Sequence, residues 1–180
     1  MRKSEPQEEE NNMEIFAIID TNVIVSALIS KHSDSATVIV LDSIFFDIIT
    51  PIYNDEILYE YNSVLRRSKF NFSEERIKKT LETIKSKGIH SERLNSGEIL
   101  PDPKDLVFYE VALSKEDSFL VTGNIRHFPK KPFIVTPVEM LAIIDELRKI
   151  DVETFDQTEL IRKLMPGKGV LTKRQPTEAE

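Results

Sequence analysis

Cysteine is missing from all 180 residues of the sequence. Its absence excludes disulfide bonds, a thiolate nucleophile and cysteine-based zinc or iron–sulfur sites, and it leads us to expect a protein of the reducing cytoplasm. Glycine is scarce, with 5 residues, and the only close pair, Gly167 and Gly169, lies in a polar C-terminal stretch. A glycine-rich phosphate loop or dinucleotide-binding fingerprint between a strand and a helix is therefore excluded.

An excess of positive charge is also missing. The chain has 24 Lys and Arg against 31 Asp and Glu, which gives a formal net charge of -7. Bulk charge therefore cannot drive binding to nucleic acid, and any such contact must be local. No apolar run is long enough to cross a bilayer, because Asp20, Lys31, Asp42 and Asp47 interrupt the hydrophobic stretches.

The length of the chain suits one domain with its own hydrophobic core, which we expect over residues 13–150. Acidic residues rather than an apolar segment follow Arg2 and Lys3. We therefore expect residues 1–12 to be a disordered extension and not a signal peptide. Residues 151–180 are less periodic, and we expect them to form a partly flexible C-terminal extension.

Short apolar runs predict strands over residues 15–19, 45–50, 119–122 and 134–136. The second strand is expected to stop at Pro51, because proline cannot donate a hydrogen bond to a sheet. Helical spacing of apolar residues predicts intervening helices that begin near residues 22, 35, 57, 73, 103 and 137. This alternation predicts an α/β fold of three layers, in which helices flank a parallel β-sheet on both faces.

Polar residues follow two of the predicted strands. Residues 20–22 (Asp-Thr-Asn) come after the first strand, and residues 122–124 (Thr-Gly-Asn) come after a later one. Ligands of parallel sheets bind beyond the carboxyl ends of the strands, so we expect both segments to face one cleft. Asp20 alone would suit the N-cap of the next helix, but its polar neighbours favour a functional role.

Two further acids are candidates for the same cleft. Glu60 lies roughly 100° around its predicted helix from the centre of the apolar stripe, which suits a side chain at the edge of a cleft. The alternative for Glu60 is a surface position at the boundary of that stripe. Asp102 precedes Pro103 and suits an N-cap, which leaves Asp105 free for chemistry. Alternatively, Asp105 only adds a favourable charge to the first helical turn.

A divalent cation would explain why three acids converge. Without one, the carboxylates of Asp20, Glu60 and Asp105 would repel one another and raise a pKa. Hard divalent cations prefer oxygen ligands, and Mg²⁺ typically uses one or two carboxylates while it keeps several waters. The three acids therefore make most physical sense as a cation site, and bound metal should stabilise the fold.

Four segments together resemble the PIN-domain ribonucleases, most closely the branch of toxin components of toxin–antitoxin pairs. They are D-T-N after an apolar strand, E-Y-N-S-V-L-R-R, D-P-K-D-L-V-F-Y-E-V-A and F-L-V-T-G-N-I-R-H-F-P, in that order. The resemblance covers roughly residues 14–146. It rests on the joint occurrence of the four segments.

The resemblance implies a parallel α/β fold whose acidic cluster holds Mg²⁺ or Mn²⁺ and cleaves single-stranded RNA. The family acids fall on Asp20, Glu60 and Asp105. Asp20 would then bind the metal directly, and Asp105 would be a ligand or a general base. Glu60 would be a ligand or would orient the attacking water.

Polar positions of the family site fall on Asn22 and Thr122, which would position phosphate or water together with Asn124. Many members of the family carry an aspartate where this chain has Asn124. An amide keeps an oxygen ligand but loses a charge, which bears on the number of metal ions. The resemblance also implies a cognate antitoxin protein as partner, and it is compatible with a homodimer.

RNA also needs positive surface, and residues 62–93 are locally basic. The predicted RNA contacts are Arg66, Arg67 and Lys69, just beyond the helical glutamate, whereas a solvated helical face explains most of the other charges. His127, in the N-I-R-H-F-P turn, would reach the cleft as a phosphate contact, but a surface or packing role is favoured. The four tyrosines are expected to pack rather than to stack on bases: Tyr53, Tyr59, Tyr61 and Tyr109.

Two other functions are compatible with the sequence. An aspartyl phosphotransferase also places an aspartate after the first strand, but Asn22 stands where such enzymes usually have a second acid. A non-catalytic RNA-binding or protein-binding module of the same fold is suggested by Asn124. Metal-dependent RNA cleavage distinguishes the nuclease from this module, and stable aspartyl phosphorylation would indicate the phosphotransferase.

Overall fold

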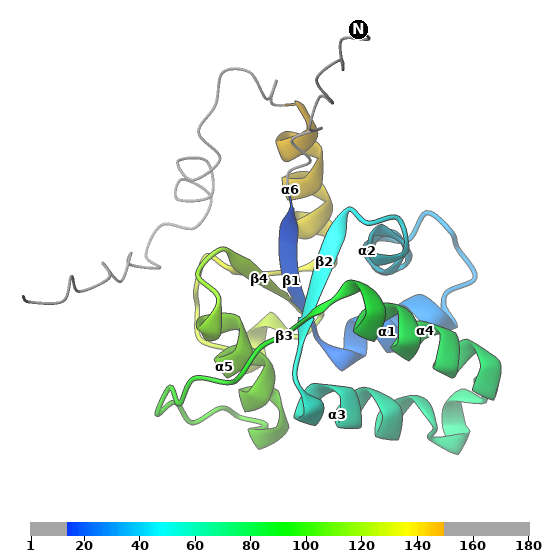
Figure 1. Cartoon of the computed structure of the whole chain (residues 1–180), viewed down its shortest axis with the longest axis horizontal. Coiled ribbons are helices and arrows are strands. Elements are labelled where there is room, and N and C mark those ends of the chain that lie inside the picture. Colours follow the sequence, from blue (N-terminus) through cyan, green and yellow to red (C-terminus); the bar gives the residue numbers. More distant parts are fainter. Residues whose placement is uncertain (1–13, 150–180) are drawn as a thin grey trace, which may run out of the picture.

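The computed structural model describes residues 14–149, so the extensions expected over residues 1–12 and 151–180 lie outside the described residues (Figure 1). In the described part, five parallel strands form one sheet in the order β3-β2-β1-β4-β5. The strands are β1 (Ile15–Ile19), β2 (Ile49–Tyr53), β3 (Ile89–His90), β4 (Ser118–Val121) and β5 (Ile134–Val135). The predicted parallel α/β fold is confirmed.

Six α-helices and three 3₁₀ turns connect the strands within residues 14–149. The helices are α1 (Thr21–Ile29), α2 (Ala36–Phe45), α3 (Asp55–Leu65), α4 (Glu74–Lys87), α5 (Leu106–Ser114) and α6 (Pro137–Lys149). The 3₁₀ turns are η1 (Ser68–Phe70), η2 (Pro103–Asp105) and η3 (Ile125–His127). Polar side chains cap several of these elements. Asn54 accepts the Ile57 N–H at 2.8 Å, and Asp102 accepts the Lys104 N–H at 3.0 Å.

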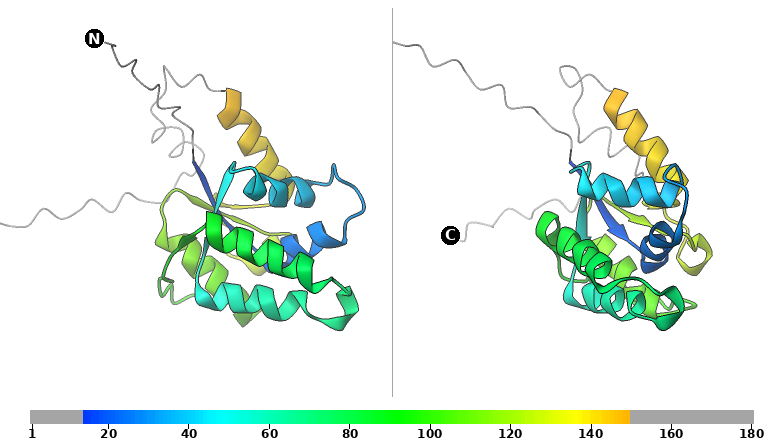
Figure 2. Two further views of the ribbon diagram at one scale, coloured as in Figure 1. Left: turned by 45° about the vertical axis from the view of Figure 1, so that its right-hand side comes forward. Right: turned by 90° about the vertical axis from the view of Figure 1, so that its right-hand side faces the viewer.

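The order of the strands determines which face each helix covers. The connections from β1 to β2 and from β2 to β3 step towards one edge of the sheet, and the later ones step towards the other edge. Right-handed crossovers therefore place α5 on the face opposite α1, α2 and α4. Figure 1 shows this arrangement, with α3 crossing below the strands. α6 lies beside α2, and α3 lies beside α4 (Figure 2).

The second strand differs from the prediction over residues 45–50. α2 continues through Phe45, and Asp47 turns the chain with a positive φ of 58°. Lys87 Nζ donates to Phe45 O at 2.9 Å and to Asp47 Oδ2 at 2.6 Å, which holds this turn. β2 begins later, at Ile49, and includes Pro51.

Pro51 is tolerated inside the strand because of its place in the sheet. It pairs with β1, whereas β3 pairs only with Ile52 and Tyr53. One side of β2 is therefore an edge at Pro51, where a missing N–H costs no ladder hydrogen bond. β3 itself was not predicted, since it has two exposed residues and no apolar run.

The connections reverse direction between β1 and β4. In open parallel sheets, ligands bind beyond the carboxyl ends of the strands at such a switch point. Asp20 follows β1 and Thr122 follows β4, so the fold brings the two predicted polar segments to this place. No helix within residues 14–149 combines the length and the apolar character that a bilayer crossing requires.

Candidate active site

Asp20 is held rigidly at the end of β1. Its backbone N–H donates to Val121 O at 2.9 Å, and its side chain is only 4% exposed. Asp20 Oδ1 accepts the Asn22 backbone N–H at 3.3 Å, which caps α1. Asp20 Oδ2 accepts the Thr122 hydroxyl at 2.7 Å and the Asn22 side-chain amide. Asp20 is thus both an N-cap and a buried acid at the switch point.

Asn22 and Gly123 join the two polar segments. Asn22 Oδ1 accepts the Gly123 N–H at 2.9 Å, while its Nδ2 donates to Asp20. A Cβ at position 123 would lie 2.9 Å from Asn22 Oδ1, closer than side chains normally approach. Glycine at this position therefore permits the contact. The Asn124 N–H donates to Thr122 Oγ1 at 2.9 Å, which extends the network to the exposed Asn124.

Tyr61 holds the backbone next to Asp20 through a hydrogen bond. The Tyr61 hydroxyl, on α3, donates to the carbonyl of Ile19, and its ring packs beside Phe108. Burial and the nearby charge of Asp20 hold the pKa of Tyr61 well above its usual value, so the phenol stays neutral.

The four tyrosines were expected to pack in the protein. Tyr53, Tyr61 and Tyr109 do so, because they are buried. The same expectation is wrong for Tyr59, whose side chain is 74% exposed. Tyr59 lies on the outer surface of α3, so packing contributes little there and does not explain why a tyrosine occupies this position.

Asp105 lies in η2 and contacts the turn that follows β4. Its Oδ2 lies 2.9 Å from Nδ1 of His127, in η3, and accepts a hydrogen bond from that ring. Burial raises the pKa of Asp105, and the hydrogen bond from His127 offsets part of the rise. Burial also raises the pKa of Asp20, and the charge of Asp105 adds to that rise although Thr122 and Asn22 donate to the carboxylate.

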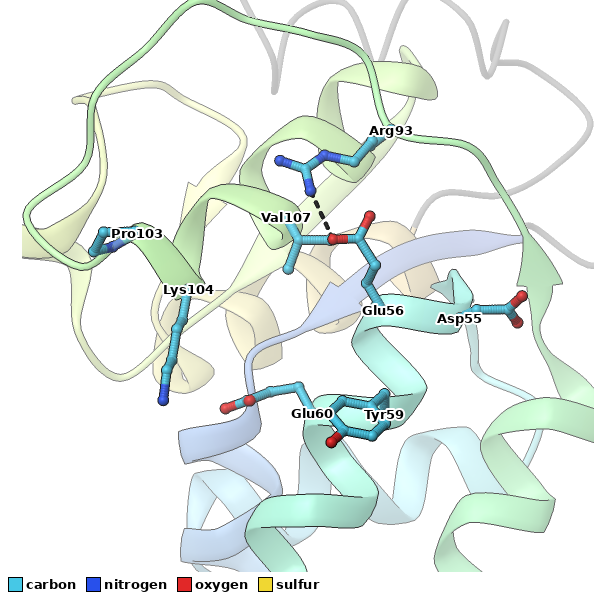
Figure 3. A pocket seen from close by; sticks show the side chains of 8 residues that line it. All are labelled: Asp55, Glu56, Tyr59, Glu60, Arg93, Pro103, Lys104 and Val107. Atoms are coloured by element: carbon cyan, nitrogen blue, oxygen red, sulfur yellow. Dashed lines mark hydrogen bonds and ion pairs between the residues drawn. The ribbon is translucent and has the colours of Figure 1, made fainter.

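Glu60 takes a different position. It is half-buried on α3 and borders a pocket with Lys104, the residue before Asp105 (Figure 3). Glu60 is not among the groups that shift the pKa of Asp20 or Asp105. Within residues 14–149, no three acidic or histidine side chains lie close enough together to form a metal cluster. The charge of Asp105 therefore acts on Asp20, whereas Glu60 borders the neighbouring pocket.

The pair of Asp20 and Asp105 fits a divalent cation. Mg²⁺ commonly binds one or two carboxylates and completes its shell with water. No cationic side chain of the described part bonds to Asp20, and its Oδ1 has only one long hydrogen bond. The hydroxyl of Thr21, the next residue, is buried without a hydrogen-bond partner in the same part of the chain. Carboxylate oxygens such as those of Asp20 suit a hard cation.

The predicted RNA contacts differ in how free their charges are. Arg66 is bound to Glu74 and Asn62, so much of its charge is compensated. Arg67 forms no ion pair among the described residues, and Lys69 lies 4.8 Å above the ring of Phe70. Arg67 and Lys69 are exposed at η1, beyond the end of α3.

Comparison with known proteins identifies the fold family. A family model described as PIN domain matches residues 17–126, more than half of the chain. The chain belongs to the PIN domain family. The matched range contains Asp20, Glu60 and Asp105 as well as residues 122–124, and it ends one residue before His127.

One solved structure is similar to this PIN domain over part of its length. It is described as VapBC2 from Rickettsia felis bound to a DNA fragment from the promoter. The identity is 21%, the match covers 62% of this chain and 90% of the other, and the TM-score is 0.42. No curated protein matches the sequence.

Two contributions to the PIN domain site were missed by the sequence analysis. The first is the contact between His127 and Asp105, which are 22 residues apart and meet only in the folded chain. The second is the role of Gly123, which its place between Thr122 and Asn124 did not reveal. The polar residues that follow β4 in the sequence were the available signal for these two contributions. Their order does not show which residues they contact in the folded chain.

Proposed function

We propose that this PIN domain protein is a metal-dependent endoribonuclease that hydrolyses phosphodiester bonds of single-stranded RNA. The observation that carries the proposal is the buried carboxylate of Asp20 at the switch point, which the charge of Asp105 reaches and which has no cationic partner in the described part. Buried like charges are costly unless a cation binds them. The motif resemblance adds the expectation of RNA as substrate.

Asp20 and Asp105 would hold Mg²⁺ or Mn²⁺. Such an ion, when bound, lowers the pKa of water and neutralises charge on the phosphate. Asn22 and Thr122 orient the Asp20 carboxylate through their hydrogen bonds. Asp105 would alternatively accept the proton of the attacking water.

Glu60 and Asn124 act from the edges of the site. Glu60 faces the region near Lys104 and would orient water there (Figure 3). Asn124 is exposed and would contact a phosphate or a water through its amide. Arg67 and Lys69 would hold a more distant part of the RNA, whereas Arg66 must first leave Glu74.

We further propose that the ribonuclease is the toxin of a toxin–antitoxin pair and acts in the cytoplasm. The partner would be a small antitoxin protein that covers the acidic cleft. This part of the proposal rests on the resemblance of the four sequence segments to the toxin branch of the family. A homodimer is compatible with it.

The test is cleavage of a mixed pool of single-stranded RNA by the purified full chain with Mn²⁺, with Mg²⁺ and with a chelator. The proposal predicts cutting with a metal ion and none with the chelator. Cleavage that persists at the same rate in chelator would contradict the metal dependence. Adding a candidate antitoxin from the neighbouring reading frame should stop the cleavage.

A non-catalytic RNA-binding module is the second candidate. It is favoured by Asn124 in place of an acid and by the position of Glu60 apart from the pair of aspartates. Binding of the RNA pool without cutting under any metal condition would support it over the nuclease.

A further inference from the structure

A pocket of about 440 Å³ lies between α3 and α5, next to the candidate active site (Figure 3). We call it the α3–α5 pocket. Tyr59 and Glu60 of α3 form one wall, and Pro103, Lys104 and Val107 form the other. Glu60 borders the pocket and is also a candidate site residue, while Lys104 directly precedes Asp105 in the chain. Through these two residues the pocket adjoins the candidate active site.

A network of ion pairs holds the upper wall of the pocket in place. Arg93 Nη1 donates to Glu56 Oε2 at 2.7 Å (Figure 3). Arg93 Nε donates to Glu110 Oε2 at 2.7 Å. Arg93 thus connects α3 with α5. Because Arg93 is shared between the carboxylates of Glu56 and Glu110, it is not a strong site for an external anion.

The remaining charge in the pocket is unevenly placed. Lys104 is exposed and forms no ion pair within residues 14–149. Asp55 also borders the pocket, but its carboxylate is 95% exposed and points away in Figure 3. The carboxylate of Glu60 also borders the pocket and points towards Lys104 (Figure 3), so a phosphate would bind at Lys104 on the side away from Glu60.

Tyr59 presents an aromatic surface to the same pocket. Its side chain is 74% exposed and has no ring contact or hydrogen bond in the described part. Val107 and Pro103 provide apolar surface opposite the ring. Tyr61, two residues later on α3, is by contrast fully packed and bonded to Ile19. An exposed aromatic ring and a lysine without an ion pair on the walls of one pocket are a combination that single-stranded nucleic acid binds.

We propose that the α3–α5 pocket binds one unpaired nucleotide of the RNA chain next to the cleaved bond. The base stacks on Tyr59, and its phosphate contacts Lys104. This inference rests on the proposed ribonuclease function. A pocket of this volume accommodates a single nucleotide. Bases within a duplex are already stacked and cannot reach the ring, so the pocket also selects single strands.

The first test measures equilibrium binding of a fluorescent single-stranded RNA by anisotropy, with chelator present to prevent metal-dependent cutting. Loss of one base stack predicts that Tyr59→Ala raises the Kd about 5- to 150-fold. Tyr59→Phe keeps the ring and should bind like the parent. Phe46→Ala is the matched control, because Phe46 is 72% exposed but borders a different groove beside α2.

The second test examines the phosphate contact. Removal of one contact to single-stranded RNA lowers the slope of log Kd against log salt by about 0.7, which we expect for Lys104→Gln. Melting temperatures of all variants verify that the exposed substitutions leave the fold intact.

The outcomes separate this inference from the proposed function. If the parent cuts RNA but Tyr59→Ala binds as tightly as the parent, or no more weakly than Phe46→Ala, the pocket inference is wrong and the nuclease stands. An unchanged salt slope for Lys104→Gln would overturn the phosphate contact. If the parent neither binds nor cuts RNA, the proposed function fails and the pocket inference fails with it.

Discussion

His127 Nδ1 lies 2.9 Å from Asp105 Oδ2, so a hydrogen bond joins the turn after β4 to the turn before α5. The two residues come from separate segments that meet only at the carboxyl edge of the sheet. The imidazole orients one carboxylate oxygen of Asp105 and leaves the other available for a cation or a water. Hydrogen bonds of this kind, behind a metal ligand, fix the direction of the ligand.

We expect His127→Ala to weaken the affinity for Mn²⁺ about 10- to 100-fold, because Asp105 loses its orienting partner. The measurement is the Mn²⁺ concentration that gives half of the maximal rise in melting temperature. His32→Ala is the control, since His32 is exposed and lies in the loop between α1 and α2. An unchanged Mn²⁺ midpoint for His127→Ala would show that Asp105 needs no such support.

Gly123→Ala should disturb the carboxylate of Asp20 without unfolding the protein. The new Cβ would displace the Asn22 side chain, which holds both Gly123 N–H and Asp20. Displacement of a reacting group by about 1 Å costs up to about 100-fold in rate, and we expect a loss of cleavage in that range. Asn22→Ala removes the clash together with the amide. The double variant should therefore be no slower than Asn22→Ala alone, and a further additive loss would contradict this explanation.

Asp20→Asn should raise the melting temperature of the metal-free protein at neutral pH. Burial raises the pKa of Asp20 in the folded state above its ordinary value of 3.8. The protonated Asp20 therefore contributes fully to the free energy of unfolding below pH 3.8. This contribution is lost as the pH rises through the pKa of Asp20 in the folded state. The advantage of Asp20→Asn should shrink as the pH falls towards this value. A variant that is less stable than the parent at every pH would refute the expectation.

The same variant should lose stabilisation by metal. A cation that binds only the folded protein at 100 times its Kd stabilises it by about 2.7 kcal/mol. We expect Mn²⁺ to raise the melting temperature of the parent and to leave that of Asp20→Asn nearly unchanged. An equal rise in melting temperature for both proteins would show that the cation does not bind at Asp20.

Glu110→Gln should destabilise the wall of the α3–α5 pocket. Burial alone would raise the pKa of Glu110, but hydrogen bonds from the Ser96 N–H and from Arg93 outweigh it and leave the pKa below its usual value. The carboxylate therefore stabilises the fold above the unfolded-state pKa of about 4.5, and this contribution is lost as the pH falls through the folded pKa. We expect a loss of about 1–3 kcal/mol at neutral pH, measured by urea unfolding.

The matched control for Glu110→Gln is Glu82→Gln. Glu82 is exposed and forms a surface pair with Lys78 at 3.7 Å, which contributes little to stability. The difference between Glu110→Gln and the parent should decrease on acidification. Equal stability of Glu110→Gln and Glu82→Gln at neutral pH would contradict the role of the buried pair.

Local pattern was sufficient for most of the fold. β1 has five consecutive buried apolar residues, and its prediction over residues 15–19 is confirmed. The predicted C-terminal end of the second strand, before Pro51, was wrong. Pro51 lies where one side of β2 is an open edge of the sheet, and this depends on the tertiary structure. The two residues of β3 carry no pattern that distinguishes them from a loop.

The sequence predicted that the polar segments after β1 and β4 meet, but not the other contacts of the candidate site. The rule that ligands bind beyond the carboxyl ends of parallel strands brought Asp20 and Thr122 together, and they are hydrogen-bonded at 2.7 Å. Helical periodicity placed Glu60 at the side of α3 but could not give its distance from Asp20, which depends on how α3 crosses the sheet. The exposure of Tyr59 was missed although Tyr59 lies outside the buried stripe of α3, which is Ile57, Tyr61, Val64 and Leu65.

The most direct test of the central claim is the initial rate of Mn²⁺-supported cleavage of one single-stranded RNA by the parent and by Asp20→Asn, with equal folding verified by circular dichroism. The account predicts cleavage by the parent and no detectable cleavage by the variant, because the buried carboxylate that would hold the cation is gone. Equal rates for the two proteins would contradict the assignment of Asp20 and, with it, the proposed active site.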